Sequence, residues 1–257
     1  MSLRLCVCTA TANGEYYMSM FNKHLSSFFK TITLGSTVGD FKQDKDSKDS
    51  IILYVEGPVG HDAIKYLCDD YHLPKEQRRV LWIYSLTAGV DVYRLGELVK
   101  ELQDTPFANA RGCYSSVLAE HVMYSMLYFY RQTWRSLASR AEHKWDPFLM
   151  VELRGRKVGI IGYGDIGQAS AKLLSAFGME VTGVKRSAPT KEVDEYGVRL
   201  VHGDAERERG CVNPTSWSTS SRGRRRQSGF FNKELFSMMK PSAVYISIGR
   251  RHHAERG

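Results

Sequence analysis

The chain has 257 residues, of which 42% are hydrophobic and 25% charged, with a formal net charge of +8. This is the composition of a soluble globular protein with room for two modest domains. No apolar stretch has the length of a membrane span and the start lacks a secretory signal, so we expect a cytoplasmic protein without membrane contact.

The positive charge is concentrated near the end of the chain. Residues 201–257 contain nine Arg and two Lys against five acidic residues, a net charge of +6. The basic cluster at residues 222–226 has neither a nucleic-acid-binding motif nor interleaved aromatic residues, so we expect no nucleic-acid partner.

Cysteine and histidine patterns bear on disulfides and metals. The five cysteines form neither an even set nor a C-x-x-C pair, which argues against disulfides and structural zinc and favours small buried apolar side chains. The eight histidines show no metal-ligand spacing, so we expect no metal site.

The first part of the chain alternates predicted strands and helices. Strands are expected at residues 4–9, 31–34, 51–55 and 80–86, a short strand or extended segment at 107–112, helices at 16–30 and 61–71, and a polar loop at 40–50. Such alternation predicts a parallel sheet with ligands at the carboxyl ends of its strands.

A long helix is predicted over residues 115–134. It is apolar over much of its circumference, which suits an element buried between two domains. His121 within it is read as an interior residue rather than a ligand or base. A helical and irregular connector follows to residue 153, with Trp145 expected to anchor it.

The stretch over residues 157–167 is the main motif of the chain. An apolar run at 157–161 predicts a strand buried on both faces, and it ends in three glycines at G-x-G-x-x-G spacing. Gly162 would allow the tight turn, Gly164 would let the backbone approach a pyrophosphate, and Gly167 would let the helix pack on the strand. The predicted dinucleotide-binding loop comprises Gly162, Tyr163, Gly164, Asp165, Ile166 and Gly167; a turn with only a structural role is the alternative.

A helix and a second strand complete the unit. Ile166, Ala169, Leu173 and Phe177 are expected to share the buried face of the helix, and Gly178 stands where a C-cap glycine would. The second strand is expected at residues 179–184. A pyrophosphate would lie at the helix N-terminus, where N–H groups and the helix dipole attract anions.

The residues after the second strand bear on the choice of cofactor. An acidic residue here usually holds the ribose hydroxyls of NAD(H), but this chain has Lys185, Arg186 and Ser187. Two cations and a hydroxyl suit a 2′-phosphate, which favours NADP(H) and leaves NAD(H) as the second choice. A solvated basic turn is the alternative reading of this segment.

Four segments resemble the D-isomer-specific 2-hydroxyacid dehydrogenases, in that family's order and spacing. They are Ser85-Leu-Thr-Ala-Gly-Val-Asp91, Asn109-Ala-Arg-Gly-Cys-Tyr-Ser-Ser-Val-Leu-Ala-Glu-His121, residues 153–167 and residues 230–250. Within the family, the basic residues after the second strand look most like the glyoxylate and hydroxypyruvate reductase branch.

The resemblance implies an α/β protein with a flavodoxin-like substrate domain at residues 1–114 and a Rossmann domain at 115–257. The active site would lie in the cleft between the two domains. Backbone N–H groups of Ala88, Gly89 and Val90 would bind the substrate carboxylate, and Arg250 would be the catalytic arginine that polarises the carbonyl. The implied activity is NAD(P)H-dependent reduction of a small 2-oxo acid such as glyoxylate or hydroxypyruvate.

The chain departs from the family pattern in two places. Residues 204–228 have a composition expected of a disordered segment or of an out-of-frame translation. After Arg250 only seven residues follow, without counterparts of the family's acid/base histidine and its carboxylate partner. The alternative function is therefore a truncated, catalytically inactive nucleotide-binding protein. The sequence leaves open which oxo acid fits and whether the protein forms a homodimer.

Overall fold

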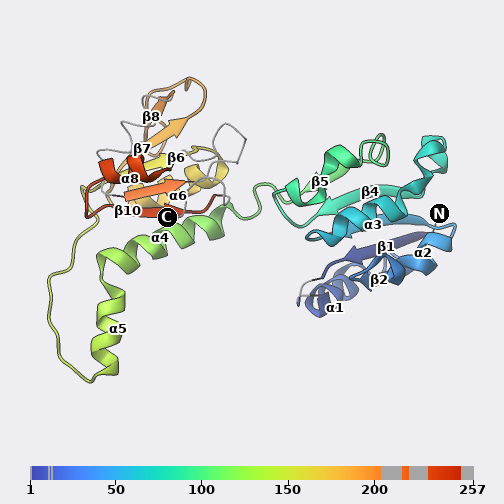
Figure 1. The fold of residues 1–257 in the computed structure, drawn as a ribbon, viewed down its shortest axis with the longest axis horizontal. Helices are drawn as coiled ribbons and strands as arrows, with labels where there is room; N and C mark the ends of the chain where they lie inside the picture. The colour runs from blue at the N-terminus through green and yellow to red at the C-terminus, as the bar shows by residue number, and fades with distance from the viewer. Residues whose placement is uncertain (1, 11, 13, 204–215, 220–230, 250–257) are drawn as a thin grey trace. The chain divides into compact units, whose positions relative to one another are not determined.

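The computed structural model describes residues 2–10, 12, 14–203, 216–219 and 231–249. The chain divides into two compact units, Met1–Cys113 and Tyr114–Gly257, each containing a five-stranded parallel sheet (Figure 1). The predicted α/β class with parallel sheets is thus confirmed. Among the described residues, no helix combines the length and apolar character that crossing a membrane requires.

The first unit has the strand order β2-β1-β3-β4-β5, which is that of flavodoxin-like sheets. Its strands are β1 (Leu3–Cys8), β2 (Thr31–Gly35), β3 (Ser50–Val55), β4 (Val80–Ser85) and β5 (Phe107–Asn109). Its α-helices are α1 (Gly14–Leu25), α2 (Lys42–Asp46) and α3 (Val59–Leu67), and its 3-10 helices are η1 (Val38–Phe41), η2 (Asp69–His72), η3 (Lys75–Gln77), η4 (Asp91–Tyr93) and η5 (Leu95–Glu97).

The polar segment at residues 40–50 is not the loop that was predicted, because it contains the end of η1 and the whole of α2. Three of its charged side chains, those of Asp44, Lys45 and Asp49, form ion pairs within the unit. The Asp44 side chain is buried and accepts a hydrogen bond of 2.9 Å from Arg4 Nη1, while Arg4 Nε donates to Asp49 at 2.8 Å. The bond from Arg4 Nε, and one from Lys30, lower the pKa of Asp49 to about 2.

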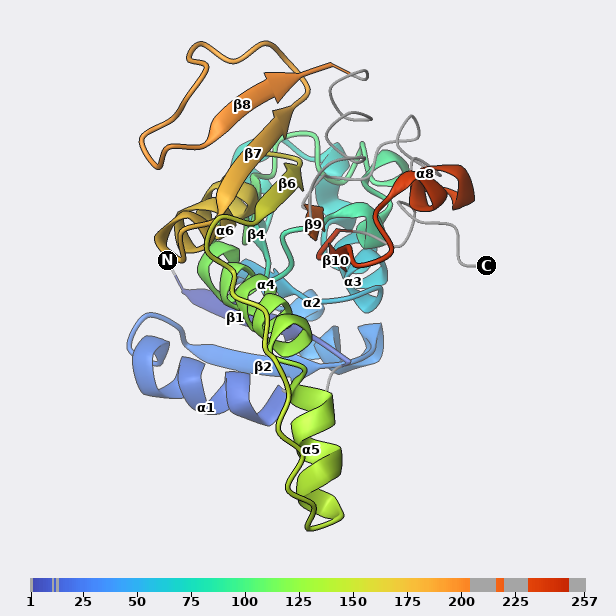
Figure 2. The ribbon, with the colours of Figure 1, turned by 90° about the vertical axis from the view of Figure 1, so that its left-hand side faces the viewer.

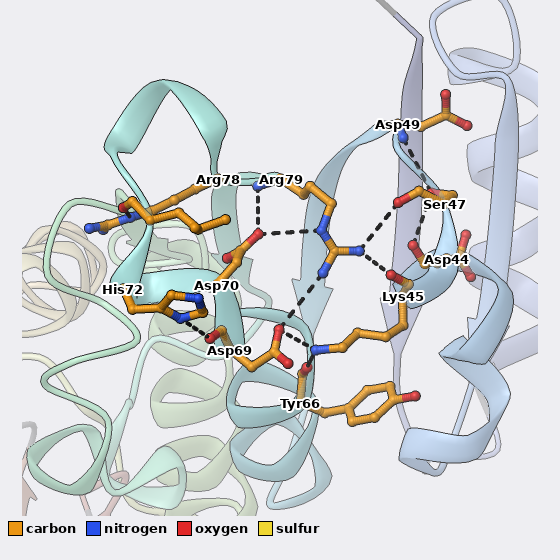
Figure 3. Close-up of polar contacts among 11 residues, drawn as sticks. Asp44, Lys45, Ser47, Asp49, Tyr66, Asp69, Asp70, His72, Arg78 and Arg79 are labelled. Atoms are coloured by element: carbon orange, nitrogen blue, oxygen red, sulfur yellow. Dashed lines mark hydrogen bonds and ion pairs between the residues drawn. The ribbon is translucent and has the colours of Figure 1, made fainter.

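A second polar network joins the segment before β4 to α2 and η2 (Figure 3). The Arg79 backbone N–H and side-chain Nε both donate to Asp70 Oδ2, at 3.0 and 3.3 Å. Arg79 Nη1 donates to the carbonyls of Lys45 and Ser47, and the Lys45 ammonium pairs with Asp69. One guanidinium therefore links three segments that are distant in sequence.

Three cysteines are small buried residues of the first unit, as predicted. Cys6, Cys8 and Cys68 are at most 2% exposed. Burial raises the pKa of Cys8 and of Cys68 to about 12, so both thiols stay protonated at neutral pH. Cys113 is exposed, and Cys211 lies outside the described residues.

The second unit has the strand order β10-β9-β6-β7-β8. Counted from β6, this is the 3-2-1-4-5 order of a doubly wound dinucleotide-binding sheet. The strands are β6 (Lys157–Ile161), β7 (Glu180–Lys185), β8 (Arg199–His202), β9 (Ser216–Thr219) and β10 (Val244–Ser247), and the helices are α4 (Ser115–Tyr130), α5 (Thr133–Ala141), α6 (Asp165–Ala176) and α8 (Lys233–Met238).

The expectation of disorder over residues 204–228 is wrong for β9. Residues 216–219 form a parallel ladder with β6 on one side and β10 on the other. A parallel ladder is made of backbone groups, so four residues with strand-compatible Trp and Thr suffice. The polar composition averaged over 25 residues concealed this short strand. The rest of 204–228 lies outside the described residues.

The single helix predicted over residues 115–134 is broken into α4 and α5. The break lies at Gln132, whose φ of +48° ends the helical path. α4 packs against α6 (Figure 2). Val122, Met123 and Met126 of α4 belong to the same core cluster as residues of α6. Val117 and Phe129 on α4 are exposed, so the helix is not buried all round, and Trp145 is 90% exposed rather than an anchor.

The buried face of α6 is also displaced from the predicted one. Gly167, Ser170, Ala171 and Leu174 are buried, whereas Phe177 is 47% exposed. Small side chains at the contact let a helix approach its neighbours closely, which a pattern of large apolar residues does not reveal. Gly178 is the expected C-cap glycine, with φ of +74° and its N–H donated to Ser175 O at 2.8 Å.

Candidate functional site

The glycine loop begins with a tight turn at the end of β6. Gly162 has φ of +95°, a conformation that other residues rarely adopt. The N–H groups of Gly162 and Tyr163 both donate to Val184 O, at 3.1 and 3.2 Å. The loop is therefore fixed to the carboxyl end of the neighbouring strand β7.

Gly164 stands at the N-cap of α6. Its backbone is extended, with φ of −101° and ψ of −157°, and no side chain caps the helix there. A Cβ built on Gly164 would meet no atom within 4 Å, so the fold itself does not require glycine at this position. The first-turn N–H groups of any helix, here those of Asp165, Ile166 and Gly167, lack intrahelical acceptors. An anion such as a pyrophosphate can approach this helix end closely.

Tyr163 is turned into the protein. It is 5% exposed, and its ring lies against Gly183 of β7, where a Cβ would come within 2.4 Å of Tyr163 Cδ2. Its hydroxyl donates a hydrogen bond to Asp194 Oδ2. The sequence reading missed both Gly183 and Asp194. A glycine between Thr182 and Val184 in a strand was an available signal of close approach by another group.

Gly183→Ala is expected to destabilise the second unit by about 1–3 kcal/mol, because the new methyl group overlaps the Tyr163 ring. Urea unfolding of the variant beside the parent chain measures this cost. Gly159→Ala, a change at a buried glycine of the neighbouring strand β6, tests whether any strand glycine is equally sensitive. An unchanged unfolding midpoint for Gly183→Ala would contradict the close contact.

The three residues predicted to bind a 2′-phosphate stand at the end of β7. Lys185 pairs with His202 of β8 and is half-buried, while Arg186 and Ser187 are exposed. None of the three side chains makes a hydrogen bond or an ion pair with another described residue. Because Ile161 and Val184 are register partners, the glycine loop and this basic segment leave the same edge of the sheet.

The predicted carboxylate-binding loop at residues 88–90 belongs to the first unit. Asn109 Nδ2 donates to Ala88 O at 2.9 Å, and Thr87 Oγ1 donates to Gly89 O at 2.8 Å. Within the described parts of the chain, the N–H groups of Ala88, Gly89 and Val90 have no acceptor. Successive free N–H groups form a concave site that suits a carboxylate.

The buried side chain of Tyr93 helps to fix the loop at residues 88–90. It was not identified from the sequence. It is fully buried, and its hydroxyl is 2.9 Å from Ser85 Oγ and donates to Val55 O at 3.2 Å. A Cβ on Gly60 would lie 2.6 Å from the Tyr93 ring, so α3 packs directly on it. The loop is thus positioned by strand ends and by one buried aromatic residue.

The remaining predictions concern Arg250, His121 and metal binding. Arg250, the predicted catalytic arginine, and residues 251–257 lie outside the described residues. His121 is exposed on α4, not interior as expected. In the described ranges, no three His, Cys, Asp or Glu side chains converge in a way that could hold a metal ion.

Comparison with known proteins identifies one family. The model of the D-isomer specific 2-hydroxyacid dehydrogenase NAD binding domain matches residues 123–256, about half of the chain. The match includes the glycine loop, the basic segment after β7 and the stretch 204–228.

Relatives and solved structures agree with this match. A hydroxypyruvate reductase from Thermotoga maritima is 30% identical over 152 residues, which cover 58% of this chain and 48% of that protein. The chain therefore spans about half the length of this relative. A family protein of Aeromonas salmonicida has a TM-score of 0.76 at 20% identity, covering 100% of this chain and 75% of the other.

A further solved structure has the same fold. It is a D-isomer specific 2-hydroxyacid dehydrogenase from Xanthobacter autotrophicus Py2 in complex with NADPH and MES, with a TM-score of 0.72 at 19% identity, covering 99% of this chain and 75% of the other. The resemblance seen in the sequence is confirmed by the family match over half of the chain. The chain belongs to the D-isomer specific 2-hydroxyacid dehydrogenase family.

Proposed function

We propose that this protein binds NADP(H) and reduces a small 2-oxo acid to the 2-hydroxy acid. The observation that carries the proposal is the basic segment at Lys185, Arg186 and Ser187 beside the glycine loop, with no acidic partner among the described residues. An acidic residue there would repel a 2′-phosphate, whereas these side chains attract it.

The glycine loop fits a dinucleotide. Gly164 leaves open space at the N-cap of α6, where the first-turn N–H groups lack intrahelical acceptors. These groups would hold the pyrophosphate, and Arg186 would hold the 2′-phosphate through a planar, bidentate contact. When bound, the nicotinamide supplies the hydride for reduction.

The substrate end of the proposal rests on the loop at residues 88–90. Its unpaired N–H groups are proposed to bind the carboxylate of the oxo acid. Arg250 is proposed to polarise the carbonyl and to stabilise negative charge on its oxygen as reduction proceeds. The name of the Thermotoga maritima relative and the NADPH in the Xanthobacter complex support this choice of substrate class and cofactor.

NADPH is expected to bind at least about tenfold more tightly than NADH, since one charge-assisted hydrogen bond to phosphate contributes about 1.5–3 kcal/mol. Fluorescence titration of both dinucleotides measures the ratio. Arg186→Asp should reverse the preference, and Arg140→Asp, at another exposed arginine of the same unit, should leave it unchanged. Equal affinities for the two cofactors would overturn the NADP(H) assignment.

Turnover separates an enzyme from an inactive nucleotide-binding protein. NADPH oxidation is followed by absorbance with glyoxylate and with hydroxypyruvate. Oxidation that depends on the oxo acid supports the proposed reaction. NADPH binding without oxidation supports the alternative of a catalytically inactive nucleotide-binding chain.

A further inference from the structure

The loop that carries Arg186 has few attachments of its own. It connects β7 to β8, and residues 186–191 make no hydrogen bond or ion pair with any other described residue. At its start it is held by Lys185, the last residue of β7 and the register partner of His202. The other end of the loop must be fixed by residues 192–198, which do form hydrogen bonds with other described residues.

Those contacts form a turn built around Asp194. The Asp194 N–H donates to Val198 O at 3.1 Å, and Val193 bridges to Arg199 at the start of β8. Asp194 Oδ1 accepts from the N–H groups of Tyr196 and Val198, at 2.9 and 3.0 Å. One carboxylate oxygen therefore closes the turn from within.

The second oxygen of the Asp194 carboxylate bonds to the glycine loop rather than to the turn. Asp194 Oδ2 accepts the hydroxyl hydrogen of Tyr163, the residue between Gly162 and Gly164. Burial alone would raise the pKa of Asp194, but hydrogen bonds from Tyr163, Val198 and Tyr196 outweigh it and lower the pKa. The carboxylate thus stays ionised and remains an acceptor at neutral pH.

Neither end of this bond has much freedom to move. The Tyr163 ring is buried against Gly183, and the Tyr163 N–H is bonded to Val184 O. On the other side, the Lys172 ammonium of α6 lies 5.8 Å from the centre of the Tyr196 ring. The turn is therefore attached both to the glycine loop and to the helix that follows it.

We propose that Tyr163 and Asp194 are positioning residues that fix the Arg186 loop relative to the glycine loop, and so set the preference for a phosphorylated cofactor. The loop is anchored at one end by β7 and at the other by the turn at residues 192–198, which is bonded to the start of β8 through Leu200 N–H and Glu192 O. The Tyr163–Asp194 bond joins this turn to the glycine loop. A dinucleotide would contact the glycine loop through its pyrophosphate and Arg186 through its 2′-phosphate, so the separation of the two loops matters for the second contact alone. The inference rests on the proposed cofactor function.

The test is the ratio of the NADH and NADPH dissociation constants in Tyr163→Phe, which keeps the ring and removes the bond. We expect this ratio to fall at least threefold, with NADH affinity changed less than twofold. Tyr124→Phe, at an exposed tyrosine of the same unit, is the matched control and should leave the ratio unchanged. An unchanged ratio would overturn the proposal, including the case in which both dinucleotides bind equally more weakly, because that result shows a structural role only.

Two substitutions of Asp194 provide a second test of the proposal. Asp194→Asn keeps an acceptor for the Tyr163 hydroxyl and should retain most of the ratio, whereas Asp194→Ala should lose it. A result in which Asn and Ala behave alike would contradict positioning through this bond.

A third readout does not depend on cofactor. Hydrogen exchange at the N–H groups of Tyr196 and Val198 should be faster in Tyr163→Phe than in the parent chain if the bond holds the turn. If the parent chain binds neither dinucleotide, the proposed function fails, while faster exchange would still show that the bond fixes the turn. Unchanged exchange would overturn the positioning role whatever the cofactor results.

Discussion

Gly164→Asp is expected to weaken NADPH binding by at least about 100-fold, the largest functional effect that the described residues predict. The new carboxylate would occupy the open space at the N-cap of α6, where the pyrophosphate is proposed to lie. Two like charges about 4 Å apart interact unfavourably by about 4 kcal/mol near a protein surface, and 1.4 kcal/mol corresponds to about tenfold in Kd. Screening by salt reduces the first figure without removing it.

The same substitution is expected to leave the fold intact or slightly stabilised. The backbone of Gly164 is in the extended region that an N-cap residue adopts, and a Cβ there touches nothing. Aspartate is a preferred N-cap residue, worth a few tenths of a kcal/mol over glycine, and its charge interacts favourably with the helix dipole. Binding and stability should therefore change in opposite directions.

Fluorescence titration and urea unfolding of the one variant measure both effects. Gly164→Asn is the matched control, because asparagine caps the helix without adding charge, and its loss of affinity should be smaller. A Gly164→Asp chain that binds NADPH within threefold of the parent would show that no pyrophosphate approaches this helix end. A large loss of stability would show that the fold itself requires the glycine.

Tyr93→Ala is expected to destabilise the first unit by about 3–5 kcal/mol, the range for removing a buried aromatic side chain. Tyr93 is fully buried between α3 and β5, with its ring centre 5.8 Å from that of Phe107. Tyr93→Phe keeps this packing and loses the hydroxyl contacts to Ser85, Thr87 and Val55, so about 1 kcal/mol is expected.

Hydrogen exchange of peptides from residues 51–109, followed during urea unfolding, measures the unfolding of the first unit separately from that of the second. Tyr93→Phe also tests whether the Tyr93 hydroxyl fixes the loop at residues 88–90. Because the Tyr93 hydroxyl contacts Ser85 and Thr87, its loss should speed exchange at residues 88–90 more than at β3. Equal stability of the Ala and Phe variants would contradict the packing role.

Features that depend on short stretches of chain could be predicted from the sequence. The glycine spacing after an apolar run predicted β6, the turn at Gly162 and the start of α6, because each step requires only neighbouring residues. The alternation of strands and helices predicted parallel sheets for the same reason. Lys185, Arg186 and Ser187 could be assigned to a strand end from their place after the second apolar run.

The distant residues that support these loops could be identified only from the folded chain. Tyr163 and Asp194 are 31 residues apart, and Tyr93 and Val55 are 38 apart, so no local pattern joins them. The buried face of α6 was misassigned because burial there depends on what α4 and the sheet place against small side chains. Strand β9 was missed because its partners β6 and β10, not its own composition, fix its ladder. Periodicity reports the preference of a segment, whereas packing and hydrogen bonding depend on the neighbours that the fold supplies.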